Sequence, residues 1–140
     1  MKASEYYVFD ETENPTEKIS EHFGVWEFKC KDNSRVIVLN KALVELLEKV
    51  RVHFKSPVVI NSGYRTVQYN SQLPNSSPKS QHMLGNAADI RVTGVSPVNV
   101  YAYLNQLYPN SHGLGIYNTF VHVDVREKKS RWDYRTTNSK

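Results

Sequence analysis

Residues Ser80–Asp89 read Ser-Gln-His-Met-Leu-Gly-Asn-Ala-Ala-Asp and place His82 and Asp89 among small residues. The segment Ala87–Val92 is typical of a short strand, so Asp89 is expected within or at the start of a buried element. A buried carboxylate without a partner is costly. Small residues such as Gly85 also allow other backbone segments to approach closely. The stretch therefore predicts a cation site built on a short strand.

A second histidine lies in a predicted hairpin. Residues Gly113–Tyr117 and Phe120–Arg126 flank Asn118-Thr119, and a two-residue loop that begins with Asn suits a tight turn. Side chains alternate along a strand, so one face carries Val121, Val123 and Val125 and the other carries Phe120, His122 and Asp124. The valine face suits the core. The polar face is then expected to look toward a neighbouring strand.

Two imidazoles and one carboxylate, from His82, Asp89 and His122, form a good ligand set for one zinc ion. A zinc site with three protein ligands leaves its fourth position open, which is the catalytic arrangement. The alternative is that these histidines are hydrogen-bonded structural residues, because a lone histidine on a strand usually is. No His-Glu-x-x-His motif is present.

The other three histidines offer weaker ligands. His22 and His53 lie in amphipathic or polar surroundings and are interpreted as surface or edge residues. His112 precedes the predicted hairpin and is a weaker candidate for the site. The single cysteine, Cys30, excludes an intrachain disulfide and a zinc module with several cysteine ligands.

Composition favours one soluble domain. The chain has 140 residues, 39% hydrophobic and 23% charged, which is ordinary for a globular protein. No apolar run approaches the length of a membrane span. The net charge of +4 and the pI near 9.1 suit an anionic partner such as a cell-wall polymer, but are too mild to indicate nucleic acid.

The elements along the chain predict an α+β fold, with a small, mainly antiparallel sheet, helices packed on it and the metal at one sheet face. Residues 1–18 are interpreted as an N-terminal arm, 19–135 as the domain and 136–140 as a tail. Asn40 is a plausible N-cap for a helix that ends before Pro57, and Ser96-Pro97 opens a second helix that runs to about Tyr108. Residues 58–60 predict a strand, and the polar stretch 66–81 predicts a functional loop.

Three separated motifs resemble the D-alanyl-D-alanine carboxypeptidase group of zinc peptidases, which shares a larger class with lysostaphin-type endopeptidases and the hedgehog domain. The motifs are Ser62-Gly63-Tyr64-Arg65, Ser80-x-His82-x-x-Gly85-x-Ala87-x-Asp89 and Val121-His122-Val123-Asp124. They occur in the right order, and the resemblance spans roughly 23–132. The relatives that it indicates are small phage endolysins and bacterial murein hydrolases.

The resemblance implies a peptidase that cuts peptide bonds of peptidoglycan with one Zn²⁺ ion. By position, His82, Asp89 and His122 match the zinc ligands. Arg65 matches an arginine that binds the substrate carboxylate or polarises the scissile carbonyl, which suits a permanently charged guanidinium. Ser80 and Tyr64 are expected to line the pocket, with the loop 69–81 as one wall.

One position departs from the family pattern. Many members carry Glu or Asp as general base three residues before the last zinc histidine, where this chain has Thr119. Asp124 is the available substitute, since residues two apart lie roughly 6.6–7 Å apart along a strand. The alternative is that Asp124 supports His122 or pairs with Arg126 or Arg65. Tyr117 is expected to contact substrate near the metal.

The expected partners are peptidoglycan stem peptides, with no nucleic acid, no membrane insertion and a monomeric state. The N-terminus lacks the apolar region of a secretory signal, so the expectation is synthesis in the cytoplasm and action at the cell wall after release through a holin. Two other functions stay open. One is a zinc-containing wall-binding module without activity, and the other is a metal-free structural protein such as a virion component.

Overall fold

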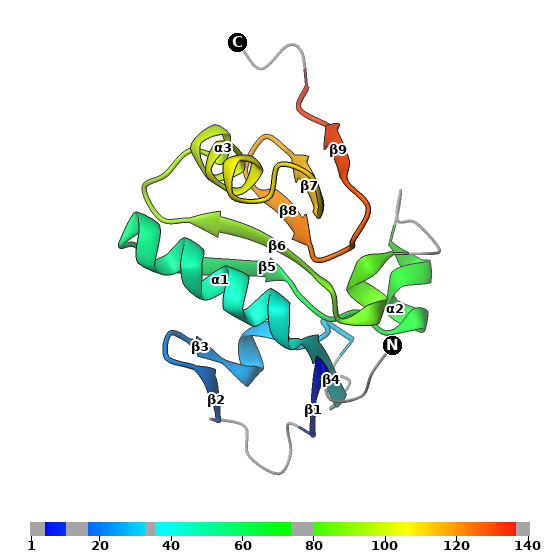
Figure 1. Ribbon diagram of the computed structural model, residues 1–140. Helices are drawn as coiled ribbons and strands as arrows, with labels where there is room; N and C mark the ends of the chain where they lie inside the picture. The colour runs from blue at the N-terminus through cyan, green and yellow to red at the C-terminus, as the bar shows by residue number, and fades with distance from the viewer. Residues whose placement is uncertain (1–4, 11–16, 33–35, 74–79, 137–140) are drawn as a thin grey trace.

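A five-stranded sheet forms the centre of the protein in the computed structural model, which describes residues 5–10, 17–32, 36–73 and 80–136 (Figure 1). The strands lie in the order β5-β6-β8-β7-β9. Their bounds are β5 Val58–Ser62, β6 Ala87–Val92, β7 Gly113–Ile116, β8 Val121–Asp124 and β9 Ser130–Asp133. Neighbours are antiparallel except β7 and β9, which pair in parallel. The predicted α+β class with a mainly antiparallel sheet is confirmed.

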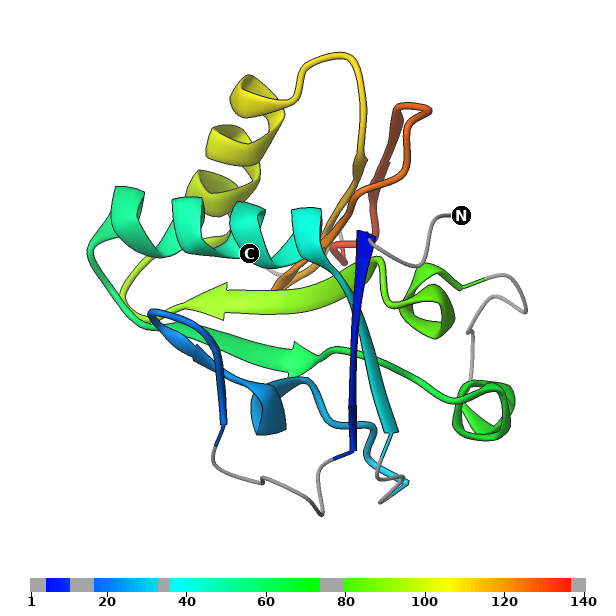
Figure 2. The ribbon, with the colours of Figure 1, turned by 60° about the horizontal axis from the view of Figure 1, so that its bottom comes forward.

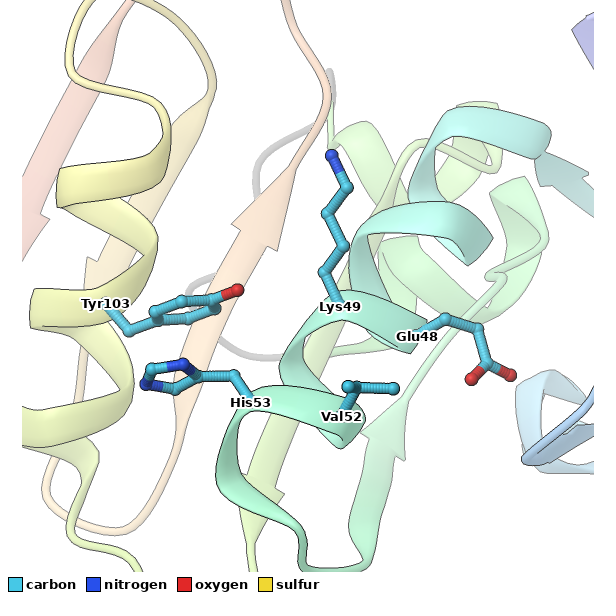
Figure 3. Close-up of a pocket in the computed structure, with 5 residues that line it drawn as sticks. All are labelled: Glu48, Lys49, Val52, His53 and Tyr103. Atoms are coloured by element: carbon cyan, nitrogen blue, oxygen red, sulfur yellow. The ribbon is translucent and has the colours of Figure 1, made fainter.

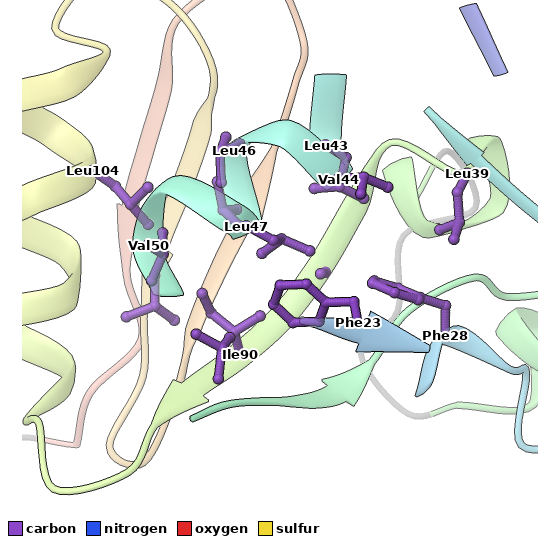
Figure 4. Close-up of a cluster of buried hydrophobic side chains, with 14 of the residues drawn as sticks. Phe23, Phe28, Leu39, Leu43, Val44, Leu46, Leu47, Val50, Ile90 and Leu104 are labelled. Carbon is purple, nitrogen blue, oxygen red and sulfur yellow. The ribbon is translucent and has the colours of Figure 1, made fainter. Parts of the chain in front are cut away.

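Two helices, α1 (Lys41–Phe54) and α3 (Pro97–Leu107), pack on one face of this sheet (Figures 1 and 2). α1 contacts β5 and β6, and α3 contacts β6, β7 and β8. The strands turn alternate residues toward the helices, and these are fully buried: Ala88 and Ile90 of β6, Leu114 of β7, Val121 and Val123 of β8. Leu104, Leu47 and Phe23 belong to the same apolar cluster (Figure 4). The predicted valine face of the hairpin is confirmed, which leaves the opposite face of the sheet for polar residues.

Local capping explains where both helices begin. The Asn40 side chain accepts a hydrogen bond from the Ala42 N–H at 2.8 Å, and Ser96 caps α3 with Pro97 at its first turn. α1 ends at Phe54, and the backbone of its C-cap residue, Lys55, is left-handed with φ 53°. Both predicted starts are confirmed. No helix among the described residues is both long enough and apolar enough to cross a membrane.

Several elements depend on distant partners and differ from the sequence interpretation. Residues Tyr6–Asp10, within the range interpreted as an N-terminal arm, form β1, which pairs with β4 (Val36–Asn40). β1 also contacts the residue that precedes β6, because the Tyr6 hydroxyl donates a hydrogen bond to the Asn86 side chain at 2.8 Å. The predicted loop Glu11–Pro15 and most of the predicted tail, 137–140, lie outside the described residues. Shorter elements complete this part: β2 Lys18–Ser20, β3 Phe23–Gly24 and the 3-10 turn η2 Val25–Phe28.

The beginning and the end of the polar stretch 66–81 form short helical elements that the sequence did not predict. Val67–Gln72 form the short helix α2, because the Thr66 hydroxyl accepts a hydrogen bond from the Tyr69 N–H at 3.1 Å and caps it. Residues 74–79 of the predicted wall lie outside the described part of the chain. The stretch ends in a second 3-10 turn, η3 (Gln81–Leu84).

Gly85 docks η3 against β4. Its φ of +74° lies in the left-handed region, and its carbonyl accepts a hydrogen bond from the Asn40 N–H at 2.8 Å. A Cβ at this position would collide with the Val38 carbonyl oxygen. The glycine therefore permits both the sharp turn and the close approach of two backbones.

Gly94 gives a matched comparison for this claim, because its φ is +77° but a Cβ added there would meet no other atom within 4 Å. We expect Gly94→Ala to lose about 1 kcal/mol from left-handed strain alone. Gly85→Ala should lose about 1–3 kcal/mol more, because it adds a steric clash. Urea unfolding measures both, and equal losses would contradict the role assigned to Gly85.

Candidate metal centre

Three elements bring His82, Asp89 and His122 together on the polar face of the sheet. His82 lies in η3, Asp89 in β6 and His122 in β8. The antiparallel register of β6 and β8 places Asp89 directly opposite His122. One ligand atom from each of the three residues lies within 4.8 Å of the others, and all three residues are buried. The structure thus gathers the three residues that the sequence indicated.

The hydrogen bonds of the two imidazoles decide which ring nitrogen faces the carboxylate. His82 Nδ1 lies 2.7 Å from the Gly63 carbonyl oxygen. A carbonyl only accepts, so Nδ1 carries the proton and Nε2 keeps its lone pair. That Nε2 lies 3.3 Å from Asp89 Oδ1. His122 turns its Nδ1 toward the same oxygen, at 3.0 Å.

The electrostatics of this cluster favour bound positive charge. Burial alone would raise the pKa of Asp89, but the neighbouring imidazoles of His122 and His82 hold it well below its usual range. Burial would likewise lower the pKa of His122, yet its bonds to Asp124 and Asp89 raise it. A divalent cation would supply the same charge between the three donors. Two imidazole nitrogens and one carboxylate oxygen suit zinc, so the residues present fit this ion.

Arg65 lies beside the donors, where the Ser62-Gly63-Tyr64-Arg65 motif was expected to bring it. Its backbone N–H donates to the His82 carbonyl at 3.1 Å. Its guanidinium lies 3.4 Å from Asp89 Oδ2, and it also donates to the side chains of Ser62 at 3.2 Å and Asn70 at 3.3 Å. A fixed cationic group therefore borders the cluster on the side of the second Asp89 oxygen.

Asp124 occupies a different place from that expected of a general base. It is fully buried, and its Oδ2 lies 2.7 Å from His122 Nε2, the ring nitrogen that faces away from Asp89. Its Oδ1 accepts a hydrogen bond from the Gly113 N–H at 3.1 Å, and the Arg126 guanidinium donates a hydrogen bond of 2.7 Å to each carboxylate oxygen. The imidazole thus separates Asp124 from the space between the donors. This geometry disfavours the general-base interpretation and favours the alternative, in which Asp124 supports His122.

Besides Arg65, the three residues expected to contact substrate differ in their surroundings. The Ser80 hydroxyl accepts from the His82 N–H at 3.2 Å, so it caps η3. Tyr64 packs against the core, and burial raises its pKa, with Cys30 and Asp32 nearby. Tyr117 borders the cluster. Burial raises its pKa, and Asp89 contributes to the same rise.

Gly115 of β7 makes room for Trp132, a residue that sequence reasoning missed. Gly115 lies opposite both His122 and Trp132, and a Cβ there would collide with the indole of Trp132. The indole ring is thereby held 5.0 Å from the His122 ring and donates to the Tyr117 hydroxyl at 3.1 Å. The pattern Gly113-Leu114-Gly115 was the available signal, since alternate glycines leave one strand face open.

The remaining histidines lie outside this cluster. His53 stacks on Tyr103 at 3.9 Å in a hollow of about 460 Å³ between α1 and α3 (Figure 3). That hollow is on the helix-covered face, away from the donors. His112 stacks on Tyr108, and His22 bonds to Glu48. Among the described residues, only His82, Asp89 and His122 form a group with metal-binding spacing.

A family comparison agrees with this site. The family model described as Peptidase M15 matches residues 17–124, more than three quarters of the chain. The chain belongs to the peptidase M15 family. This is the D-Ala-D-Ala carboxypeptidase-like family of zinc peptidases, so the resemblance seen in the three motifs is confirmed. No curated protein and no solved structure was found to match the chain.

The M15 assignment and the donor geometry predict one zinc ion per chain. We expect His82→Ala and His122→Ala each to weaken zinc binding at least about 100-fold. Removing a metal ligand should reduce the zinc affinity more than removing a residue that only hydrogen-bonds to a ligand. His53→Ala removes an exposed histidine on the other face and should bind zinc like the unaltered protein. Chelator competition measures the affinities. Unchanged binding in both site variants would contradict the assignment.

Proposed function

We propose that this M15 peptidase hydrolyses peptide bonds of bacterial peptidoglycan, as a D-Ala-D-Ala carboxypeptidase or a murein endopeptidase. The observation that carries the proposal is the buried His82, Asp89 and His122 cluster with a fixed arginine beside it. The family supplies the reaction class, a zinc-dependent cleavage of a peptide bond. The net charge of +4 suits an anionic wall polymer.

The three donors would hold zinc through His82 Nε2, the Asp89 carboxylate and His122 Nδ1. Bound zinc acts as a Lewis acid on a carbonyl oxygen and lowers the pKa of water. Everything else in the site comes from the chain. Gly63 and Asp124 fix the two imidazoles from outside, at 2.7 Å each.

Arg65 is proposed to bind the peptide. Its guanidinium is always charged, and Ser62 and Asn70 hold it in place. It can therefore fork onto a terminal carboxylate, as a carboxypeptidase requires, or stabilise the oxygen of the carbonyl that is attacked. Tyr117 is proposed to contact the same substrate. Because its oxygen accepts from Trp132, its own proton is available to a substrate oxygen.

A second candidate function is a zinc-containing module that binds the wall without cutting it. Two observations favour it. Position 119 is a threonine, and Asp124 is engaged by His122, Gly113 and Arg126. Both proposals predict zinc binding, so only product formation separates them.

Digestion of purified peptidoglycan tests the peptidase proposal. We expect the zinc-loaded protein to release D-alanine or to create new peptide termini, detected by mass spectrometry of the muropeptides. Chelation should abolish the products and zinc should restore them, with His122→Ala as the inactive control. Zinc-dependent wall binding without any product would contradict the peptidase and support the binding module.

Arg65→Lys tests the role of the guanidinium. Lysine keeps the charge but loses the fork, so we expect kcat/KM to fall about 100-fold, a loss typical of one missing transition-state donor. Zinc affinity should stay within a few fold, because Arg65 is not a ligand. Arg91→Lys is the matched control, since Arg91 lies exposed on the same strand as Asp89. A normal kcat/KM in Arg65→Lys would remove Arg65 from the mechanism.

A further inference from the structure

Two Asp-x-Arg forks of the same local geometry lie near the end of the chain. In Asp124-Val125-Arg126, the guanidinium donates through Nε and NH2 to the two carboxylate oxygens at 2.7 Å each, and the Arg126 N–H donates to Oδ1 at 3.2 Å. In Asp133-Tyr134-Arg135, the corresponding distances are 2.9, 2.6 and 3.0 Å. The two segments therefore have the same spacing of Asp and Arg in the sequence and the same pattern of hydrogen bonds.

The two forks differ in burial and in what their carboxylates reach. The Asp133 side chain is 51% exposed, whereas Asp124 is fully buried. Asp124 also contacts His122 Nε2 at 2.7 Å and accepts from the Gly113 N–H. A surface pair of this kind contributes little to stability. A buried carboxylate, in contrast, requires its counter-charge.

The buried fork lies between Gly113 and Trp132. A Cβ at Gly113 would collide with the Asp124 carboxylate and lie 2.7 Å from Arg126 Nε. On the other side, the Arg126 guanidinium lies 5.5 Å from the centre of the Trp132 ring, which itself packs 5.0 Å from His122. Trp132 and Gly113 therefore border the Arg126 guanidinium. The guanidinium is hydrogen-bonded to the Asp124 carboxylate, which in turn is hydrogen-bonded to the His122 imidazole.

We infer that Arg126 is a positioning residue of the zinc site, which acts through Asp124 to keep the His122 Nε2–H pointed at the carboxylate and Nδ1 turned toward Asp89. The inference rests on the proposed function, because it requires zinc at the three donors. Arg126 touches none of the donors itself. A lysine there would place a single point charge near one oxygen, so only the planar fork fixes both oxygens at once.

Arg126→Gln tests the inference, with Arg135→Gln as the matched control from the exposed fork. We expect the zinc dissociation constant of Arg126→Gln to rise about 10–100-fold, the loss typical of an outer partner of a metal ligand. Arg126→Lys should fall between this variant and the unaltered protein, and Arg135→Gln should leave the constant unchanged. The visible spectrum of the cobalt(II)-substituted protein gives a second readout, which should change in Arg126→Gln alone.

Unaltered zinc affinity and cobalt spectrum in a folded Arg126→Gln would overturn the inference, and so would an equal loss in Arg135→Gln. If Arg126→Gln does not fold, the imidazole nitrogen resonances of the unaltered, zinc-loaded protein decide the matter. His122 should then carry its proton on Nε2, and the reverse assignment would overturn the inference. If the unaltered protein binds no zinc, the proposed function is overturned together with this inference. If the unaltered protein binds zinc and Arg126→Gln binds it with the same affinity, this inference alone is overturned.

Discussion

Both imidazoles of the site face a single carboxylate oxygen, Asp89 Oδ1. This oxygen lies 3.3 Å from His82 Nε2 and 3.0 Å from His122 Nδ1. This convergence depends on the register of β6 and β8, which puts Asp89 directly opposite His122. A slip of one residue would turn every side chain of one strand to the other face. The valine residues of β8 disfavour such a slip, because the slip would move their side chains out of the core. The apolar face of the sheet thereby fixes the chemistry of the polar face.

The polar face depends in turn on the small residues that flank the donors. Gly85 lets η3 press against β4, and Gly63 presents its carbonyl to His82 Nδ1. Gly113 and Gly115 leave space for the Asp124 carboxylate and the Trp132 indole. At Gly113 and Gly115 the missing side chain makes room for groups beside His122, whereas at Gly85 and Gly63 it allows close contact with Val38 and Phe28. The glycine positions therefore matter for the geometry of the site as well as for the turns.

The parts of the fold that sequence predicted correctly are those with local causes. Asn40 caps α1 through its own neighbour, and the alternating valines of β8 show which face is buried. In contrast, β1 exists because β4 lies beside it, and nothing within Tyr6–Asp10 indicates that partner. The candidate ligands His82, Asp89 and His122 could be found from motif spacing. Their choice of ring nitrogen could not, because it depends on the Gly63 carbonyl and Asp124.

Asp124 shows most clearly where spacing stops being informative. Two residues along a strand from His122, it lies at a distance that suits either a base or a support. The difference comes from the Gly113 N–H and the Arg126 fork, which engage its oxygens on the side of His122 away from Asp89. Trp132 was missed for a related reason. It reaches His122 only because β9 pairs in parallel with β7, a long-range pairing that the local sequence does not reveal.

The central claim is that one zinc ion sits between His82, Asp89 and His122. Diffraction from zinc-loaded crystals, recorded on both sides of the zinc absorption edge, locates the metal without reference to activity. The account predicts one anomalous peak bonded to His82 Nε2, an Asp89 oxygen and His122 Nδ1. A peak at other residues, or none among these three side chains, would contradict it.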